Sequence, residues 1–278
     1  PVLYLSPDDF ETTGWEGMVR QSIEFYINGD IQGAFNSIEN VPGDVPDPRF
    51  YAYRASLLLA VGRVDEAEAD IMEALNLDPR YSDAFSLETI IFIVKNEKEK
   101  ALTAAQKAVE ANPDSATAEI ALSYAQQASF DLKGARESLE RAVELDPENA
   151  LAWARLAEIQ ASFGNLGKAL SSAQEAAALE PNLSRTQTVL GFAYLSQVDT
   201  KKAKAAFEKA ITLDQADYLP RLGLGLAMIR DGDLNGGGRQ IEIAASLDPN
   251  NSLVRSYLGK TYFEEKRTGK DVREYEIA

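Results

Sequence analysis

Proline recurs in this 278-residue chain at an interval of 34 residues. Four consecutive prolines keep the interval, and a fifth follows after twice that distance. The series is Pro79, Pro113, Pro147, Pro181 and Pro249, with Gln215 at the skipped place. A fixed period of this length indicates one supersecondary unit repeated along the chain, because each unit buries its apolar face against the next.

Small residues follow the same period. When the proline is counted as position 32, the units begin at Pro48, Ser82, Ala116, Ala150, Ser184 and Tyr218. Position 8 is always small, and positions 20 and 27 hold alanine in every unit except for Gly237. Two helices can lie close together only where their side chains are small, and proline ends the second helix. The pattern predicts one antiparallel helix pair per unit, with N-caps at Ser82, Asn149, Ser184, Asp217 and Asn251.

These positions resemble the tetratricopeptide repeat family, which has small residues at 8, 20 and 27 and proline at 32. The resemblance covers roughly residues 15–278. It implies an all-α fold, a right-handed α-solenoid superhelix of antiparallel helix pairs. The expected segments are an N-terminal extension (1–14), a first helix pair (15–47), six consecutive repeats (48–251) and a truncated eighth repeat (252–278). We expect the chain to be part of a longer protein.

The resemblance implies a non-catalytic protein-interaction scaffold that binds a peptide or helix of a partner protein in its concave groove. First-helix positions 2, 5, 6, 9, 12 and 13 line that groove in the family. The residues carried over are Leu87, Ile90, Ile93, Tyr124, Arg155, Glu158, Arg185, Val189, Phe192, Leu222 and Leu226. For any one of them the alternative is core packing between adjacent repeats. Charged substitutions at Phe192 and Leu226 are expected to weaken binding more than stability.

A second hypothesis is a structural, oligomerisation or spacer module within a larger bacterial protein, and the chain is also compatible with a homo-oligomer. An enzyme is not expected, since cysteine and histidine are absent and no catalytic constellation stands out. No cofactor is expected. The net charge of −16 argues against nucleic acid as a partner. No segment is long and apolar enough for direct membrane insertion, and the bacterial envelope is slightly favoured over the cytoplasm.

One segment fits a calcium-binding loop, D-x-[DN]-x-[DN]-G-x5-E, through Asp231, Asp233, Asn235 and Glu242. The repeat register predicts instead an ordinary turn at the same place, and we favour that interpretation over a metal site. The three glycines at 236–238 predict a late or frayed start of the following helix, because glycine destabilises helices. The alternative is a hinge or a close backbone approach by a partner.

Two further departures stand out. Arg54 and Glu88 replace the usual leucine at position 7 in consecutive repeats, so they either pair with each other or mark a changed packing. Asp271 replaces the small residue in the last unit. The segment from Tyr262 to Ala278 is similar to the repeat region of large bacterial envelope proteins that carry a FecR-type domain.

Overall fold

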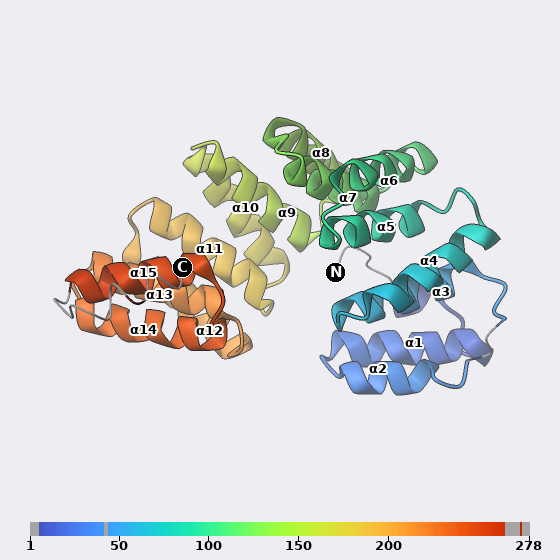
Figure 1. The fold of residues 1–278 in the computed structure, drawn as a ribbon, viewed down its shortest axis with the longest axis horizontal. Helices are drawn as coiled ribbons and strands as arrows, with labels where there is room; N and C mark the ends of the chain where they lie inside the picture. Colours follow the sequence, from blue (N-terminus) through green and yellow to red (C-terminus); the bar gives the residue numbers. More distant parts are fainter. Residues whose placement is uncertain (1–5, 42–43, 265–272, 274–278) are drawn as a thin grey trace. The chain divides into compact units, whose positions relative to one another are not determined.

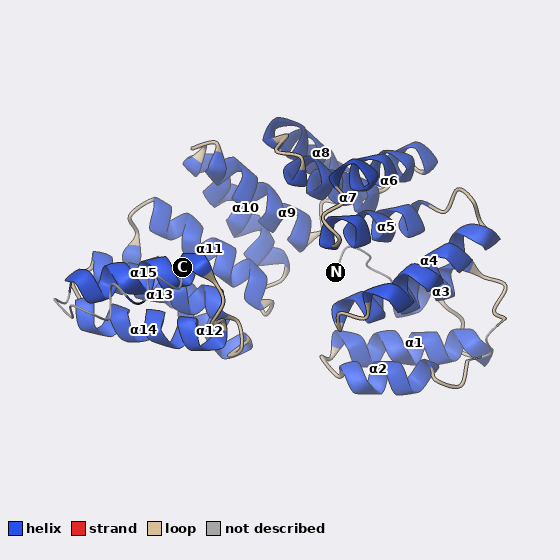
Figure 2. Cartoon of the chain, viewed as in Figure 1, coloured by secondary structure: helices blue, strands red, loops and turns tan. Residues whose placement is uncertain are grey.

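The structure is a computed structural model that describes residues 6–41, 44–264 and 273. Within these residues every regular element is helical and no strand occurs (Figure 2). The chain divides into two compact units, Pro1–Asp146 and Pro147–Ala278. Consecutive helices pack as pairs within each unit, which confirms the expected all-α fold of repeated helix pairs (Figure 1).

The first unit contains four helix pairs preceded by a short 3₁₀ helix. Its elements are η1 (Pro7–Asp9), α1 (Gly14–Ile27), α2 (Ile31–Ile38), α3 (Pro48–Ala60), α4 (Val64–Leu77), α5 (Ser82–Val94), α6 (Lys98–Ala111), α7 (Ala116–Ala128) and α8 (Leu132–Leu145). The second unit contains three pairs and one further helix. Its elements are α9 (Ala150–Ser162), α10 (Leu166–Leu179), α11 (Ser184–Ser196), α12 (Thr200–Leu213), α13 (Tyr218–Arg230), α14 (Leu234–Leu247) and α15 (Ser252–Glu264).

The periodic alanines lie at the closest contacts between helices. Those at positions 20 and 27 are buried to within 1% of complete exclusion from solvent; they are Ala67, Ala74, Ala101, Ala108, Ala135, Ala142, Ala169, Ala176, Ala203, Ala210 and Ala244. Larger side chains fill the space between these contacts, as Leu139 and Ile241 do. The small residues thus set the spacing of the helices, and the large ones supply most of the buried apolar area.

Helix starts follow the predicted caps at three of five places. The side chains of Asn149, Asp217 and Asn251 accept hydrogen bonds from backbone amides two or three residues ahead. The prediction is wrong for Ser82 and Ser184, which are already the first residues of α5 and α11. Their hydroxyls donate instead to the carbonyls of Ala108 and Ala210 in the second helix of the same repeat, at 2.9 and 3.1 Å, tying the two helices together.

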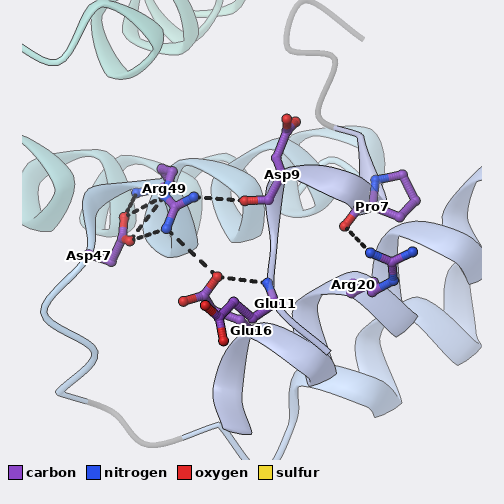
Figure 3. A network of polar contacts seen from close by, with 7 residues as sticks. All are labelled: Pro7, Asp9, Glu11, Glu16, Arg20, Asp47 and Arg49. Atoms are coloured by element: carbon purple, nitrogen blue, oxygen red, sulfur yellow. Dashed lines mark hydrogen bonds and ion pairs between the residues drawn. The ribbon is translucent and has the colours of Figure 1, made fainter. Parts of the chain in front are cut away.

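The N-terminal segment is fastened to α1 and α3 by two arginines (Figure 3). Arg49 donates to the backbone carbonyl of Asp9 at 2.8 Å and also contacts both carboxylate oxygens of Asp47. Arg20 donates to the carbonyl of Pro7 at 3.1 Å. Phe10, 3% exposed, lies under the Arg49 guanidinium. Through these contacts residues 7–10 pack against α1 and α3, the first helices of the first two pairs.

The turn inside each helix pair contains one residue with a positive φ angle at position 15. Glycine fills it in four pairs, as Gly29, Gly62, Gly164 and Gly232. Asn96, Phe130 and Val198 occupy it in the others, with φ of 58°, 64° and 65°. Side chains with a Cβ, and β-branched ones above all, are strained in this left-handed region.

Replacing Val198 by glycine is therefore expected to raise the free energy of unfolding by about 0.5–1 kcal/mol, because the released strain exceeds the entropy that glycine adds to the unfolded chain. Urea unfolding of the two proteins measures the difference. The reverse change, Gly164→Val at the equivalent place, should lower stability. A Val198→Gly protein no more stable than the parent would contradict the strain argument.

The three successive glycines of α14 do not delay its start, so the expected late or frayed helix is wrong. The helix begins at Leu234, with the Asp233 carboxylate accepting from the amide of Gly236 at 2.8 Å. A Cβ placed on Gly237 would lie 2.6 Å from the carbonyl oxygen of Gly225 in α13. The glycines instead allow the two helices of this pair to approach through their backbones.

Candidate functional site

The predicted groove residues of the first unit are largely packing residues. Leu87 is 2% exposed and belongs to the core that α3, α4 and α5 share. Ile93 is half-buried against a second core cluster around Ala101 and Ala105. Ile90 and Tyr124 are also half-buried. Of this set, Leu87 is inaccessible to a partner.

The apolar residues predicted for the groove of the second unit also differ in how far they are buried. Val189 and Leu222 are buried, at 6% and 2% exposure. Leu226 is half-buried against the core of α13, α14 and α15. Phe192 is half-buried and stands edge-on against Phe207, with ring centroids 4.9 Å apart. Of these four apolar residues, only Phe192 and Leu226 remain partly open to solvent.

Three of the predicted residues meet around one pocket in the second unit. The pocket has a volume of about 240 Å³ and is walled by α9, α10, α11 and the start of α13. Glu158, Val189 and Phe192 line it together with Ala157, Ala161, Ala169, Thr188, Ala193 and Leu219. Four of these side chains are alanines, so the hollow exists because the small residues that space the helices leave room between the larger ones.

Charged side chains meet at one edge of this pocket. Glu158 receives a hydrogen bond from Arg185 of α11 and lies 3.9 Å from a guanidinium nitrogen of Arg155, one helical turn earlier. Arg185 is the most exposed of the three, at 41% of its side chain. Among the residues that the structure describes, Glu158 engages one of its five N–H donors, so the guanidinium has further donors for a second carboxylate. The three predicted charged residues therefore form one cluster beside an apolar hollow.

The prediction missed Thr188 and Leu219, which line the pocket. They occupy positions 5 and 2 of their repeats, the same groove positions that identified Arg185 and Leu222. The periodic register therefore contained the signal. Ala161, at position 12, was missed because an alanine offers no chemistry of its own.

Three segments of the chain match profiles of a known repeat family. Residues 126–191 match one profile described as tetratricopeptide repeat. Residues 48–81 and 184–217 match a second profile with the same description. These segments are tetratricopeptide repeats. No curated protein sequence matches it significantly.

Solved structures with tetratricopeptide-type folds resemble the chain. A chain of the APC/C hetero-tetramer Cut9-Hcn1 has a TM-score of 0.81 at 15% identity, and the match covers 94% of this chain and 52% of that one. This chain thus spans about half the length of that relative. A tetratricopeptide repeat protein from Parabacteroides merdae has a TM-score of 0.59 at 16% identity, covering 89% and 98%. YrrB, described as having an unusual peptide-binding site, has a TM-score of 0.50 at 17% identity, covering 71% and 97%.

The segment that fits a calcium loop has the structure of an ordinary tetratricopeptide turn and second helix. Asp233 caps α14, and Asn235 and Glu242 lie within that helix. Glu242 accepts a hydrogen bond from the Tyr262 hydroxyl at 2.7 Å, and Asp231 is ion-paired with Lys204. In the described part of the chain, no three acidic side chains come close enough to hold a metal ion.

Two other features bear on the sequence predictions. None of the helices described here is long and apolar enough to cross a membrane. Most of the segment from Tyr262 to Ala278, including Asp271, lies outside the described residues. Its similarity to FecR-domain envelope proteins stays a prediction.

Proposed function

We propose that this chain is a non-catalytic interaction scaffold whose second unit binds a partner peptide at the pocket between α9, α10, α11 and α13. The observation that carries the proposal is the hollow of about 240 Å³, walled by alanines and by Val189, Phe192 and Leu219. Such a hollow suits one apolar anchor side chain, and anchors in pockets dominate the energetics of peptide recognition.

The charged residues at the edge of the pocket favour a particular kind of partner residue next to that anchor. Arg185 is more exposed than the Glu158 carboxylate to which it donates. A carboxylate of the partner can bind its outer N–H groups, as arginine commonly does in recognition. The favoured partner segment therefore has an aliphatic or aromatic anchor beside an aspartate or glutamate. YrrB, a protein of similar fold that is described as having a peptide-binding site, is consistent with this class of function.

Substitutions at Phe192 and Leu226 are unsuitable for testing this proposal. Phe192 packs on Phe207, and Leu226 packs on the core of its own repeat, so charges there would disturb folding as well as binding. Ala161 is a better place, because it is exposed and lines the pocket. A tryptophan at this position would place its indole ring in the pocket and so exclude the anchor side chain of a peptide.

We expect Ala161→Trp to weaken peptide binding by at least about tenfold, which corresponds to about 1.4 kcal/mol. The ligands are obtained by selecting a displayed random-peptide library on the wild-type chain, and affinities are measured by fluorescence anisotropy. The matched control is Ala178→Trp, on an exposed face of α10 away from the pocket. Selected peptides that bind Ala161→Trp as tightly as wild type would overturn the site.

Light scattering on the same proteins distinguishes this function from the structural alternative. A docking module remains a monomer with and without the tryptophan. A symmetric dimer that Ala161→Trp dissociates would instead favour self-assembly through this face.

A further inference from the structure

Position 7 of the repeat lies at the contact between the first and second helices. Leucine fills it in five units, as Leu122, Leu156, Leu190, Leu224 and Leu258. Arg54 and Glu88 occupy it in α3 and α5. These two successive repeats therefore place a charge where the five units that follow place leucine, and a charge in such a position requires a partner.

The first of these charges has its partner within its own helix pair. Arg54 makes two hydrogen bonds to Asp70 of α4, with its Nε at 2.7 Å and an Nη at 2.6 Å from the two carboxylate oxygens. Asp70 is 6% exposed and occupies position 23. The Arg54 guanidinium also lies over the ring of Phe50, at 4.9 Å from its centroid. In this repeat the residues at positions 7 and 23 thus form a complete guanidinium–carboxylate pair.

The second charge lacks this arrangement. Position 23 of the next repeat is Ala104, so no carboxylate or cation of α6 faces Glu88 from that place. A pocket of about 300 Å³ occurs there, lined by Glu88, Phe92, Glu99, Lys100, Thr103, Ala104 and Lys107. Within the described part of the chain no hydrogen bond or ion pair engages the half-buried Glu88 carboxylate. The empty volume lies where the preceding repeat holds its ion pair.

The electrostatics of the pocket agree with a missing cation. Burial raises the pKa of Glu88, Lys107 opposes that rise, and Glu68 of α4 adds to it. Lys107 lies over the ring of Phe85, at 5.5 Å, rather than on the carboxylate. Lys100 is held by Glu97 at 2.6 Å. The two lysines of the lining thus have other contacts, and within the described residues neither forms an ion pair with Glu88.

We propose that this pocket of α5 and α6 binds a guanidinium group, supplied by an arginine side chain of a partner protein. The guanidinium would bind the Glu88 carboxylate as Arg54 binds Asp70, with the polarity of positions 7 and 23 reversed. The face of Phe92 provides an aromatic wall that attracts cations, and the Lys100 ammonium already lies 5.5 Å from its centroid, so a bound guanidinium would compete with Lys100 for this ring. This site lies in the first unit and is independent of the peptide pocket on α9 and α11.

The test uses the full chain and two small probes that differ only in charge. N-acetyl-arginine amide carries the guanidinium, and N-acetyl-citrulline amide is its uncharged counterpart of the same shape. Both are titrated into isotopically labelled protein, and amide shifts of α5 and α6 are followed by NMR. We expect saturable shifts with the arginine probe, at least about tenfold weaker binding of the citrulline probe, and a similar loss in Glu88→Gln. Equal binding of the two probes, or unchanged binding in Glu88→Gln, would overturn the proposal.

Three further variants separate this site from simpler explanations. Glu99→Gln neutralises a carboxylate at the exposed side of the same pocket and should retain most of the binding. Lys107→Met removes a competing cation and should strengthen binding with little change in melting temperature. A marked loss of stability in Lys107→Met would identify Lys107 as the internal partner of Glu88 and refute the proposal. Glu88→Leu restores the residue of the other repeats, and it should raise the melting temperature while abolishing binding; a lower melting temperature would count against an unpaired carboxylate.

Discussion

Replacing Phe207 by alanine is expected to lower the free energy of unfolding by about 3–5 kcal/mol, the usual range for a fully buried phenylalanine. The side chain is completely excluded from solvent in α12. It fits between two helices because Gly191 of α11 and Gly223 of α13 carry no side chain. A Cβ on Gly191 would lie 2.5 Å from the ring. Truncation therefore leaves a cavity that neither neighbour can fill.

Urea unfolding of the intact chain, monitored by circular dichroism, measures this loss. Phe263→Ala is the matched control, because that ring is 64% exposed and its removal should change stability by no more than about 0.5 kcal/mol. A loss below about 1.5 kcal/mol in Phe207→Ala would show that the surrounding helices collapse into the space. That outcome would contradict the view that the helices around the ring are held rigidly in place.

A double-mutant cycle tests the geometry directly. Gly223→Ala should destabilise the parent protein, because its new Cβ would overlap the Phe207 ring. In the Phe207→Ala background the same change should cost much less, giving a coupling energy of about 1–3 kcal/mol. Additive effects of the two substitutions would show that Gly223 does not contact the ring.

The second large effect concerns the backbone contact within α13 and α14. Gly237→Ala is expected to lower the free energy of unfolding by about 1–3 kcal/mol, even though alanine favours helix over glycine. Its Cβ would lie 2.6 Å from the carbonyl oxygen of Gly225 and 2.5 Å from a side-chain carbon of Ile229. A backbone atom cannot move aside as the end of a flexible side chain can, so the helices must separate.

Gly167→Ala is the control, because it is also a glycine early in a second helix. No heavy atom lies within 4 Å of a Cβ placed there. Helix propensity then acts alone, and Gly167→Ala should raise stability by up to about 1 kcal/mol. Differential scanning calorimetry of the two variants should give opposite shifts in melting temperature. A gain in stability for Gly237→Ala would show that the helices can separate at this point without cost.

The sequence was sufficient for the helix pairs because their periodic residues act through backbone spacing. Alanine at positions 20 and 27 can be recognised without coordinates, and it is buried wherever it recurs. The glycines at 236–238 misled the prediction because helix propensity is a local quantity. The close approach that they permit depends on Gly225, which lies in the preceding helix. Ser82 was misassigned as a cap for a similar reason, since its partner Ala108 is distant in sequence.

The candidate site was predictable only in part. The register assigned both Glu158 and Arg185 to the groove, but it did not predict the ion pair that joins them between α9 and α11. It could not distinguish Val189 from Phe192: both line the pocket, but Val189 is buried and Phe192 is partly exposed. Both are apolar residues at groove positions, and their exposure depends on how closely α11 packs against α9 and α13. Spacing in the sequence does not give that distance.

The position of Phe207 has a consequence for how the second unit comes apart. One ring is held simultaneously by α11 and α13, the first helices of two successive repeats, so neither repeat can open without exposing it. Most repeat proteins can fray one unit at a time from an end. Here the two repeats should behave as one cooperative block, and their amide protons should exchange together with a single opening free energy. A protease would then cleave this region only after both repeats have opened together, and not after one repeat has opened alone.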